Sequence, residues 1–263
     1  MRLILPSFAK LNLTLRVINK RPDGYHNIVS TFLKIPSGDV LYVSESTAGI
    51  DIVNTNIPIE GENIVAKALR VARENGFRIP PINVVIHKSI PPGSGLGAGS
   101  GNAAAILLLF GAGKIASKVG ADVPFLCSDL TMAIASGIGD HIEPAKEVAP
   151  HGVIVIPEWQ TDTKNAYAEL DAMGFGVDTM LARTEMKDMY HANAGKKVGL
   201  LPNDFSKVLL KKHPKYNEIF SIFNRSGAAD AWGITGSGSA AFAVLRKSVK
   251  FNWPSYIKHV LYF

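Results

Sequence analysis

The sequence predicts an α+β fold in which strands and helices do not alternate in a regular β-α-β-α order. The first half is rich in short segments with strand periodicity and contains one amphipathic helix before a glycine-rich run. The second half contains three helical patterns and, near its end, two apolar strands around residues 236–239. The 263 residues suffice for one large or two small domains. We expect an N-terminal domain over 1–152 and a C-terminal domain over 153–263.

In the first half, apolar residues at 11, 13, 15 and 17 alternate with polar ones, which predicts a half-buried strand. A helix is predicted over 63–75, because apolar side chains share one face and Gly76 follows as a stop signal. The remaining patterns predict strands over 28–35, 39–46, 50–54, 84–86, 153–156, 232–235 and 240–245, and helices over 164–173, 205–211 and 215–226.

The composition is typical of a globular protein, with 47% hydrophobic and 19% charged residues. The net charge of +6 is spread along the chain, whereas a nucleic-acid-binding face usually needs a concentrated basic patch. An anionic small substrate explains the excess equally well. Cys127 is the only cysteine, which excludes an intrachain disulfide and suits a reducing compartment. The N-terminus lacks the apolar run of a signal peptide, so we expect a cytoplasmic protein.

The glycine-rich run at 90–105 reads I-P-P-G-S-G-L-G-A-G-S-G-N-A-A-A. It predicts a phosphate cradle, because glycine lets backbone N–H groups turn toward an anion and a helix over 103–110 follows. The alternative is a flexible linker. The run contains neither the G-x-x-x-x-G-K-[ST] nor the G-x-G-x-x-G pattern. The candidate cradle residues are Pro92, Gly93, Ser94, Gly95, Leu96, Gly97, Ala98, Gly99 and Ser100.

Three other segments carry polar groups suited to chemistry. Lys10 and Asn12 lie two residues apart on the first predicted strand, so both side chains point to the same face. Tyr25 and His26 follow a predicted turn and offer an aromatic face beside a hydrogen-bonding ring. Asp122, in the segment G-A-D-V-P-F, supplies a carboxylate that could take part in chemistry. The alternative is that Asp122 is the N-cap of a helix.

These segments, in this order, resemble the GHMP kinases, and most closely the family of 4-diphosphocytidyl-2-C-methyl-D-erythritol kinases. The resemblance covers nearly the whole chain. The matching motifs are A-K-x-N-L at 9–13, D-G-Y-H at 23–26, E-N-x-V at 62–65, P-P-G-S-G-L-G at 91–97, G-A-D-V-P-F at 120–125, T-x-x-x-Y at 163–167 and T-G-S-G-S at 235–239.

The resemblance implies two catalytic residues, with Lys10 beside the reacting hydroxyl and Asp122 accepting its proton. It implies a cytosine stacked between Tyr25 and Tyr167, with His26 hydrogen-bonded to the edge of the base. Asn63 and Lys88 match positions at the adenine end of the nucleotide. The implied nucleotide site therefore comprises residues 92–100, Asn63 and Lys88, and the implied substrate site comprises Asn12, Tyr25, His26, Tyr167, Gly236 and Ser237.

The family fold implied by the resemblance has a ribosomal protein S5 domain 2-like N-terminal lobe and a ferredoxin-like C-terminal lobe. The implied reaction transfers the γ-phosphate of ATP, with Mg²⁺, to the 2-hydroxyl of 4-diphosphocytidyl-2-C-methyl-D-erythritol, an isoprenoid precursor. The expected partner is thus a small molecule with a cytidine diphosphate group, not a nucleic acid or a membrane, and the protein is expected to be a monomer or homodimer. The alternatives are another GHMP small-molecule kinase and a non-catalytic nucleotide-binding relative.

Three features depart from the family pattern. Residues 137–140 read G-I-G-D where the family usually has G-R-G-E, so an arginine is absent. Gly101 stands where the family usually has a serine, which removes one hydroxyl near the predicted phosphate site. The segment between Asn102 and Asp122 is also shorter than is usual in the family. We therefore expect Ser100 to be the main side-chain contact of the loop to phosphate or metal.

Overall fold

The computed structural model describes residues 2–36, 38–59, 61–145, 149–192 and 196–263. The chain divides into two compact units that are interleaved along the sequence. The first unit comprises Met1–Lys10, Lys34–Pro92 and Gly97–Leu130, and the second comprises Leu11–Leu33, Gly93–Leu96 and Thr131–Phe263. The expected division into continuous domains over 1–152 and 153–263 stays a prediction.

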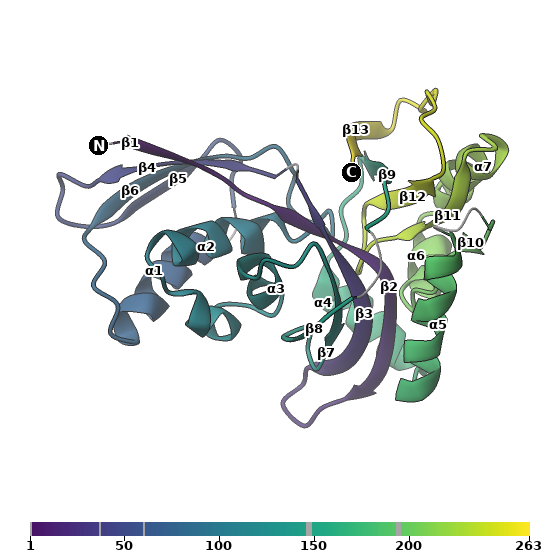
Figure 1. The fold of residues 1–263 in the computed structure, drawn as a ribbon, viewed down its shortest axis with the longest axis horizontal. Helices are drawn as coiled ribbons and strands as arrows, with labels where there is room; N and C mark the ends of the chain where they lie inside the picture. The colour runs from purple at the N-terminus through teal and green to yellow at the C-terminus, as the bar shows by residue number, and fades with distance from the viewer. Residues whose placement is uncertain (1, 37, 60, 146–148, 193–195) are drawn as a thin grey trace. The chain divides into compact units, whose positions relative to one another are not determined.

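The first unit is a four-stranded sheet with helices on one side (Figure 1). Its strand order is β1(Arg2–Pro6), β4(Val40–Glu45), β6(Ile82–His87) and β5(Ile52–Thr55), and only the β5–β6 pair is parallel. Alternate residues of β6 are buried, so one face of the sheet joins the core. The helices are α1(Ile64–Glu74), α2(Ala98–Leu109) and α3(Val123–Cys127).

Helix α2 begins five residues before the predicted start at 103, so Gly99 and Ser100 belong to its first turn. Its N-cap is Gly97, with φ of +63°. The sequence pattern missed this turn because glycine and serine are poor helix formers. Between α2 and α3, a 3₁₀ helix η1(Gly113–Lys118) makes the short connection.

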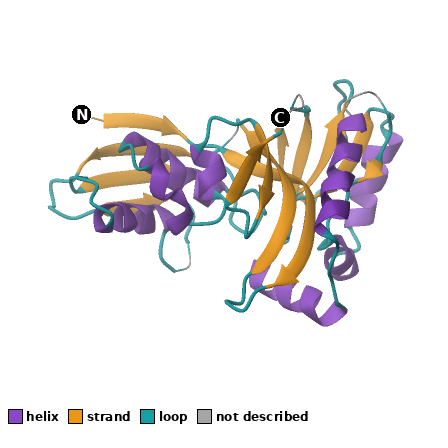
Figure 2. Cartoon of the chain, turned by 60° about the horizontal axis from the view of Figure 1, so that its bottom comes forward, coloured by secondary structure: helices purple, strands orange, loops and turns teal. Residues whose placement is uncertain are grey.

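The second unit contains two sheets. One has the order β10(Gly199–Leu200), β11(Ala229–Ile234), β12(Ala241–Leu245), β9(Gly152–Pro157) and β13(Ile257–Tyr262). The other has the order β2(Ala9–Lys20), β3(His26–Ile35), β7(Met132–Ser136) and β8(His141–Pro144), in which β2 and β3 are long neighbouring strands (Figure 2). The helices are α4(Thr163–Met173), α5(Thr179–Ala192), α6(Ser206–Lys212) and α7(Tyr216–Arg225).

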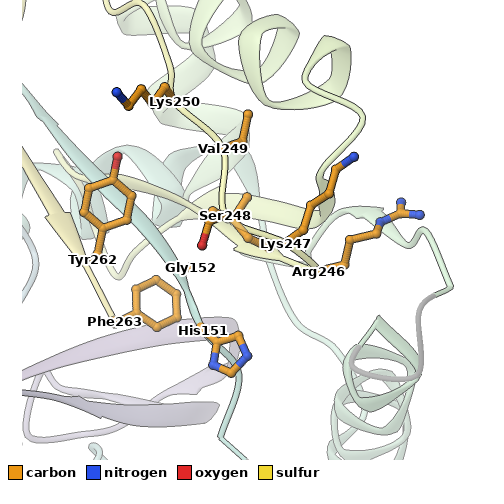
Figure 3. Close-up of a pocket in the computed structure, with 10 residues that line it drawn as sticks. His151, Gly152, Arg246, Lys247, Ser248, Val249, Lys250, Tyr262 and Phe263 are labelled. Atoms are coloured by element: carbon orange, nitrogen blue, oxygen red, sulfur yellow. The ribbon is translucent and has the colours of Figure 1, made fainter.

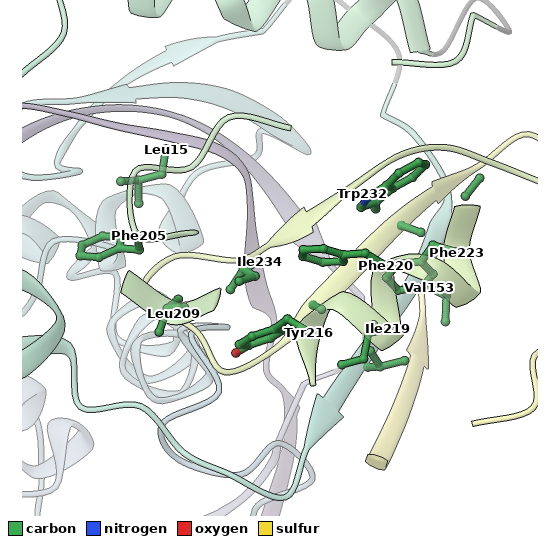
Figure 4. Close-up of a cluster of buried hydrophobic side chains, with 14 of the residues drawn as sticks. Leu15, Val153, Phe205, Leu209, Tyr216, Ile219, Phe220, Phe223, Trp232 and Ile234 are labelled. Atoms are coloured by element: carbon green, nitrogen blue, oxygen red, sulfur yellow. The ribbon is translucent and has the colours of Figure 1, made fainter. Parts of the chain in front are cut away.

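The core of the second unit is rich in aromatic residues (Figure 4). Phe220 and Phe223 on α7 pack beside Trp232 and Ile234 on β11, and Tyr216 at the start of α7 is fully buried. Tyr216 also donates a hydrogen bond of 2.7 Å to the carbonyl of Ser239. This bond connects the core directly to the loop at 235–239, which carries the last predicted site motif.

All predicted strands and helices are present within a few residues of their expected bounds. The sequence analysis did not predict β1, β7, β8, β10, β13, η1 or α5, and it anticipated α3 only through the N-cap position of Asp122. Among the described residues, no helix combines the length and the apolar character needed to cross a membrane.

Candidate active site

Lys10 and Asp122 form an ion pair in the first unit, with 3.7 Å between Lys10 Nζ and Asp122 Oδ2. The Lys10 side chain is 8% exposed, whereas the Asp122 side chain is 27% exposed. Asp122 has the N-cap position of α3, but its side chain makes no capping hydrogen bond. The carboxylate is therefore paired with the lysine and does not cap the helix.

The start of α2 passes next to this pair. A Cβ atom added to Gly97 would lie 3.1 Å from Asp122 Oδ2 and 3.1 Å from Lys10 Cε. The positive end of the α2 dipole and its first backbone N–H groups therefore lie beside a lysine and a carboxylate. A helix N-terminus next to a cation attracts an anion such as phosphate.

The glycine loop reaches this point through alternating left-handed glycines. Gly93, Gly95 and Gly97 have φ values of +70°, +78° and +63°. In the second unit, a Cβ atom on Gly95 would lie 2.6 Å from the carbonyl oxygen of Gly238 and 2.7 Å from that of Thr235. No residue except glycine fits there without displacing backbone.

The loop at 235–239 is hydrogen-bonded to this part of the glycine loop. The amides of Ser239 and Ala240 donate to the carbonyls of Gly93 and Ser94, at 3.1 and 3.0 Å. The loop at 235–239 is thus joined to the start of the glycine loop within the second unit, and a contact of Gly236 and Ser237 with phosphate stays a prediction. Ser237 Oγ also lies 2.8 Å from Thr163 Oγ1 at the start of α4.

Two buried asparagines support the loop at 235–239. The amide of Asn12 donates to Thr235 Oγ1 at 2.8 Å, and its side chain donates to Ser30 Oγ at 2.8 Å. Asn203 Nδ2 donates to the carbonyls of Ile234 and Gly236, at 2.7 and 2.8 Å. Asn12 thus contributes its backbone here, while its predicted contact with substrate stays a prediction.

His26 is held by an aromatic ring and a carboxylate in the second unit. Its ring stacks on Tyr167 with 4.4 Å between centroids, and its Nε2 lies 2.7 Å from Asp171 Oδ1. Lys20 Nζ bonds the other oxygen of Asp171 at 2.6 Å, and this contact holds the pKa of the Asp171 carboxyl below its ordinary value. His26 thus occupies the face of Tyr167 that it stacks on, and no base fits between these two rings.

Tyr25 is 60% exposed, and its ring contacts no other aromatic ring among the described residues. The expected facing arrangement of Tyr25 and Tyr167 across a gap stays a prediction. Asn63 caps α1 by accepting a hydrogen bond of 2.9 Å from the amide of Val65. A contact of Asn63 with adenine stays a prediction, and the Oδ1 atom of this side chain already accepts the capping hydrogen bond.

Lys88 is 7% exposed and bonds Asp39 Oδ2 at 2.5 Å. The same carboxylate accepts from Asn102 Nδ2 at 2.8 Å and from the amides of Ser89 and Ile90 at 2.9 and 3.2 Å. The predicted contact of Lys88 with nucleotide stays a prediction, because the structure directs its ammonium to Asp39. The sequence analysis missed Asp39, since a single aspartate after a glycine carries no recognisable signal.

A family model described as "GHMP kinases N terminal domain" matches residues 63–140. A 4-diphosphocytidyl-2-C-methyl-D-erythritol kinase of Parabacteroides distasonis is 32% identical over 260 residues, covering 93% of this chain and 92% of the relative. The enzyme of that name from Thermosipho melanesiensis is 33% identical, covering 95% and 93%. The chain belongs to the 4-diphosphocytidyl-2-C-methyl-D-erythritol kinase family.

Solved structures agree with this membership. A crystal structure of 4-(cytidine 5'-diphospho)-2C-methyl-D-erythritol kinase, 26% identical, superposes with a TM-score of 0.73 and covers 94% of this chain and 90% of its own. A homoserine kinase from Cytophaga hutchinsonii, 18% identical, shares the fold with a TM-score of 0.56, covering 90% and 84%. The predicted α+β fold of the GHMP kinases is confirmed. The protein is an ATP-dependent small-molecule kinase by family.

A cavity of about 550 Å³ lies elsewhere in the second unit (Figure 3). It is lined by residues 245–250, by His151 and Gly152, and by Tyr262 and Phe263, and it includes no predicted site residue. Its lysines are exposed, and Arg246 pairs with Asp230 at 2.6 Å. The candidate active site of this family member is therefore defined by its motifs and contacts, not by the size of a cavity.

Proposed function

We propose that the protein transfers the γ-phosphate of ATP to the 2-hydroxyl of 4-diphosphocytidyl-2-C-methyl-D-erythritol. One observation carries this proposal: relatives named for that substrate are about one third identical over more than nine tenths of the chain. The Lys10–Asp122 pair beside the start of α2 supports it from the chemical side. The proposal includes a cytoplasmic location and leaves a monomer and a homodimer as alternatives.

In the proposed reaction, the 2-hydroxyl oxygen attacks the γ-phosphorus of ATP. The bond between that phosphorus and the β–γ bridging oxygen breaks, and ADP leaves with the electron pair. Asp122 accepts the proton of the hydroxyl, and Lys10 orients the hydroxyl and interacts with the transferred phosphate. The distance between Lys10 Nζ and Asp122 Oδ2 is 3.7 Å, which is too long for a hydrogen bond. This supports separate roles for the two side chains, because Lys10 does not occupy this carboxylate oxygen.

The phosphates of ATP are proposed to bind at the start of α2, on the backbone of residues 93–100. Positive φ angles at Gly93, Gly95 and Gly97 support this, because they let consecutive N–H groups converge on one anion. Gly236 and Ser237 are proposed to contact the phosphates from the adjoining loop. The roles of Asn63 and Lys88 at the adenine end remain part of the proposal.

Mg²⁺ is proposed to arrive with ATP and to neutralise part of the phosphate charge. The described residues contain no group of three His, Cys, Asp or Glu side chains that could enclose a metal ion. Kinase sites commonly bind Mg²⁺ through substrate phosphates and one or two protein oxygens, so the donor set fits this mode. Ser100, half-buried in the first turn of α2, is the proposed protein ligand.

The cytidine group is proposed to stack on Tyr25 and to hydrogen-bond His26. A carboxylate only accepts hydrogen bonds, so the contact with Asp171 requires a proton on His26 Nε2. Nδ1 then remains as the second polar atom of the ring for the base. Tyr167 supports the proposal, because its stacking on His26 fixes the plane of the His26 ring. A direct contact of Tyr167 with the base would have to use the part of the tyrosine that His26 does not cover.

An ATP-consumption assay with three alcohols tests the proposal. The protein should consume ATP with 4-diphosphocytidyl-2-C-methyl-D-erythritol and yield a product phosphorylated at the 2-hydroxyl. Mevalonate and homoserine, which lack a nucleobase, should be poor substrates. Preference for either of them would favour another GHMP activity, and ATP binding without turnover on any alcohol would favour a non-catalytic relative.

A further inference from the structure

Asp39 contacts both ends of the glycine loop from one buried position in the first unit. It lies just before β4 and is completely inaccessible to solvent. Its Oδ1 accepts from the amides of Ser89 and Ile90, where the chain enters the loop. Its Oδ2 accepts from Asn102, in the second turn of the helix that follows the loop. One carboxylate therefore connects two points that are twelve residues apart in the chain.

The charge of Asp39 is balanced inside the protein. Lys88 Nζ lies 2.5 Å from Oδ2, and its side chain is only 4% exposed. Four donors thus surround one carboxylate, which makes this cluster stiff, because hydrogen bonds to a buried charge are strong and costly to break. A stiff support suits a loop whose backbone N–H groups have to converge on an anion.

Asn102 supports the loop through only one of the two polar atoms of its side chain. Its Nδ2 bonds Asp39, but its Oδ1 is buried and has no hydrogen-bond partner among the described residues. An unpaired buried acceptor costs stability, and loss of the side chain would in turn take a donor from the buried Asp39 carboxylate. The hydrogen bond of Asn102 to Asp39 therefore links α2 to the residue that also holds the amides of Ser89 and Ile90.

We infer that Asp39 and Asn102 are positioning residues that set the separation of the two ends of the glycine loop for the phosphates of the donor nucleotide. The inference rests on the proposed function, because it assigns ATP to this loop. Asp39 itself contacts no substrate in this account. It acts through Ile90 on one side of the loop and through Asn102 on the other.

The test is Asn102→Ala, which removes the connection to α2 and leaves the Lys88–Asp39 pair intact. Loss of one hydrogen bond to a charged group should raise the KM for ATP by about tenfold. The KM for the cytidine substrate should stay within about twofold, because the removed bond positions only the phosphate loop. Asp39→Asn should have the same pattern with a larger effect, since it also leaves Lys88 unpaired.

Asp51→Asn is the matched control in the same unit. Asp51 also bonds a cation, Arg73, at 2.5 Å and the first amide of β6 at 3.0 Å, and the hydrogen bonds and ion pairs of the described residues do not join it to residues 90–102. This variant should lose stability without a selective change in the KM for ATP. Equal increases in both KM values for Asn102→Ala, or an unchanged KM for ATP in a folded variant, would overturn the inference.

Equilibrium binding of a non-hydrolysable ATP analogue separates this inference from the proposed function. If the wild-type protein does not phosphorylate the cytidine substrate, the proposed function fails, but the analogue still reports on the loop. Weaker analogue binding by Asn102→Ala than by Asp51→Asn then supports the positioning role. Equal binding by both variants overturns it, provided that thermal unfolding shows both to be folded at the assay temperature.

Discussion

Replacement of Gly97 by alanine perturbs the site at one defined point. Gly97 is the N-cap of α2 and has φ of +63°. An added Cβ would lie 3.1 Å from Asp122 Oδ2 and from two carbons of Lys10, closer than ordinary contact. The substitution therefore has two consequences, backbone strain and displacement of the two proposed catalytic side chains.

The two consequences differ in size and in what they affect. A left-handed conformation costs a residue with a Cβ about 1–2 kcal/mol, which lowers Tm by about 2–4 °C for each kcal/mol in a protein of this size. The contact requires Asp122 and Lys10 to move by a few tenths of an ångström. Because misplacement of catalytic groups by 1 Å costs about a hundredfold in rate, we expect kcat to fall by about tenfold.

Gly111→Ala is the matched control. Gly111 has φ of +65°, almost the same as Gly97, but a Cβ there would meet nothing within 4 Å. Thermal unfolding and steady-state kinetics of both variants separate strain from contact. Both should lose similar stability, and only Gly97→Ala should lose kcat. Equal kcat values for the two variants would refute the placement of Gly97 beside the reacting groups.

Four further outcomes are expected. Asp122→Asn should lower kcat by about a hundredfold or more while ATP-analogue binding survives, and near-normal turnover would reduce Asp122 to a structural residue. Tyr25→Ala should raise the KM for the cytidine substrate by the loss of about 1–3 kcal/mol of stacking, with little change in the KM for ATP; equal changes would remove the stacking role. Burial raises the pKa of the Cys127 thiol to about 11, so alkylation by iodoacetamide at pH 8 should be much slower than that of a free cysteine. The hydrogen bond from Lys20 lowers the pKa of Asp171, so wild type should be more stable than Asp171→Asn above about pH 4, and Tm measurements should show this advantage decline as the pH falls through the folded pKa.

The sequence predicted the elements whose periodicity is strong and whose ends have clear signals. The strand around residues 11–17 alternates strictly, and α1 starts with Asn63 and stops before Gly76, so both were found. β13 was missed because its exposed Lys258 and His259 stand next to each other and interrupt the alternation of apolar and polar residues. The start of α2 was misplaced because its first turn uses glycines that local propensity excludes from helices.

The candidate site was predictable where short motifs carry it and not where distant residues meet. The pair of Lys10 and Asp122 was expected from the motifs, and the structure brings the two side chains together. The role of Asp39 depends on contacts with residues about 50 and 63 positions later, which no local pattern reveals. The structure also explains why residue 101 is a glycine and not the serine usual in the family. Any Cβ at this position would lie 1.7 Å from the carbonyl oxygen of Phe8.

The interleaving of the two units limits how the protein can be divided. The chain changes unit after residues 10, 33, 92, 96 and 130, so neither unit is one continuous polypeptide. A fragment ending at residue 152 would contain the whole first unit together with Leu15, Val17 and Ile28, which belong to the same buried cluster as Phe205, Phe220 and Trp232. Those three side chains would be uncovered and prone to self-association. Expression of a separate nucleotide-binding fragment should therefore give insoluble protein, and engineering has to use the full chain.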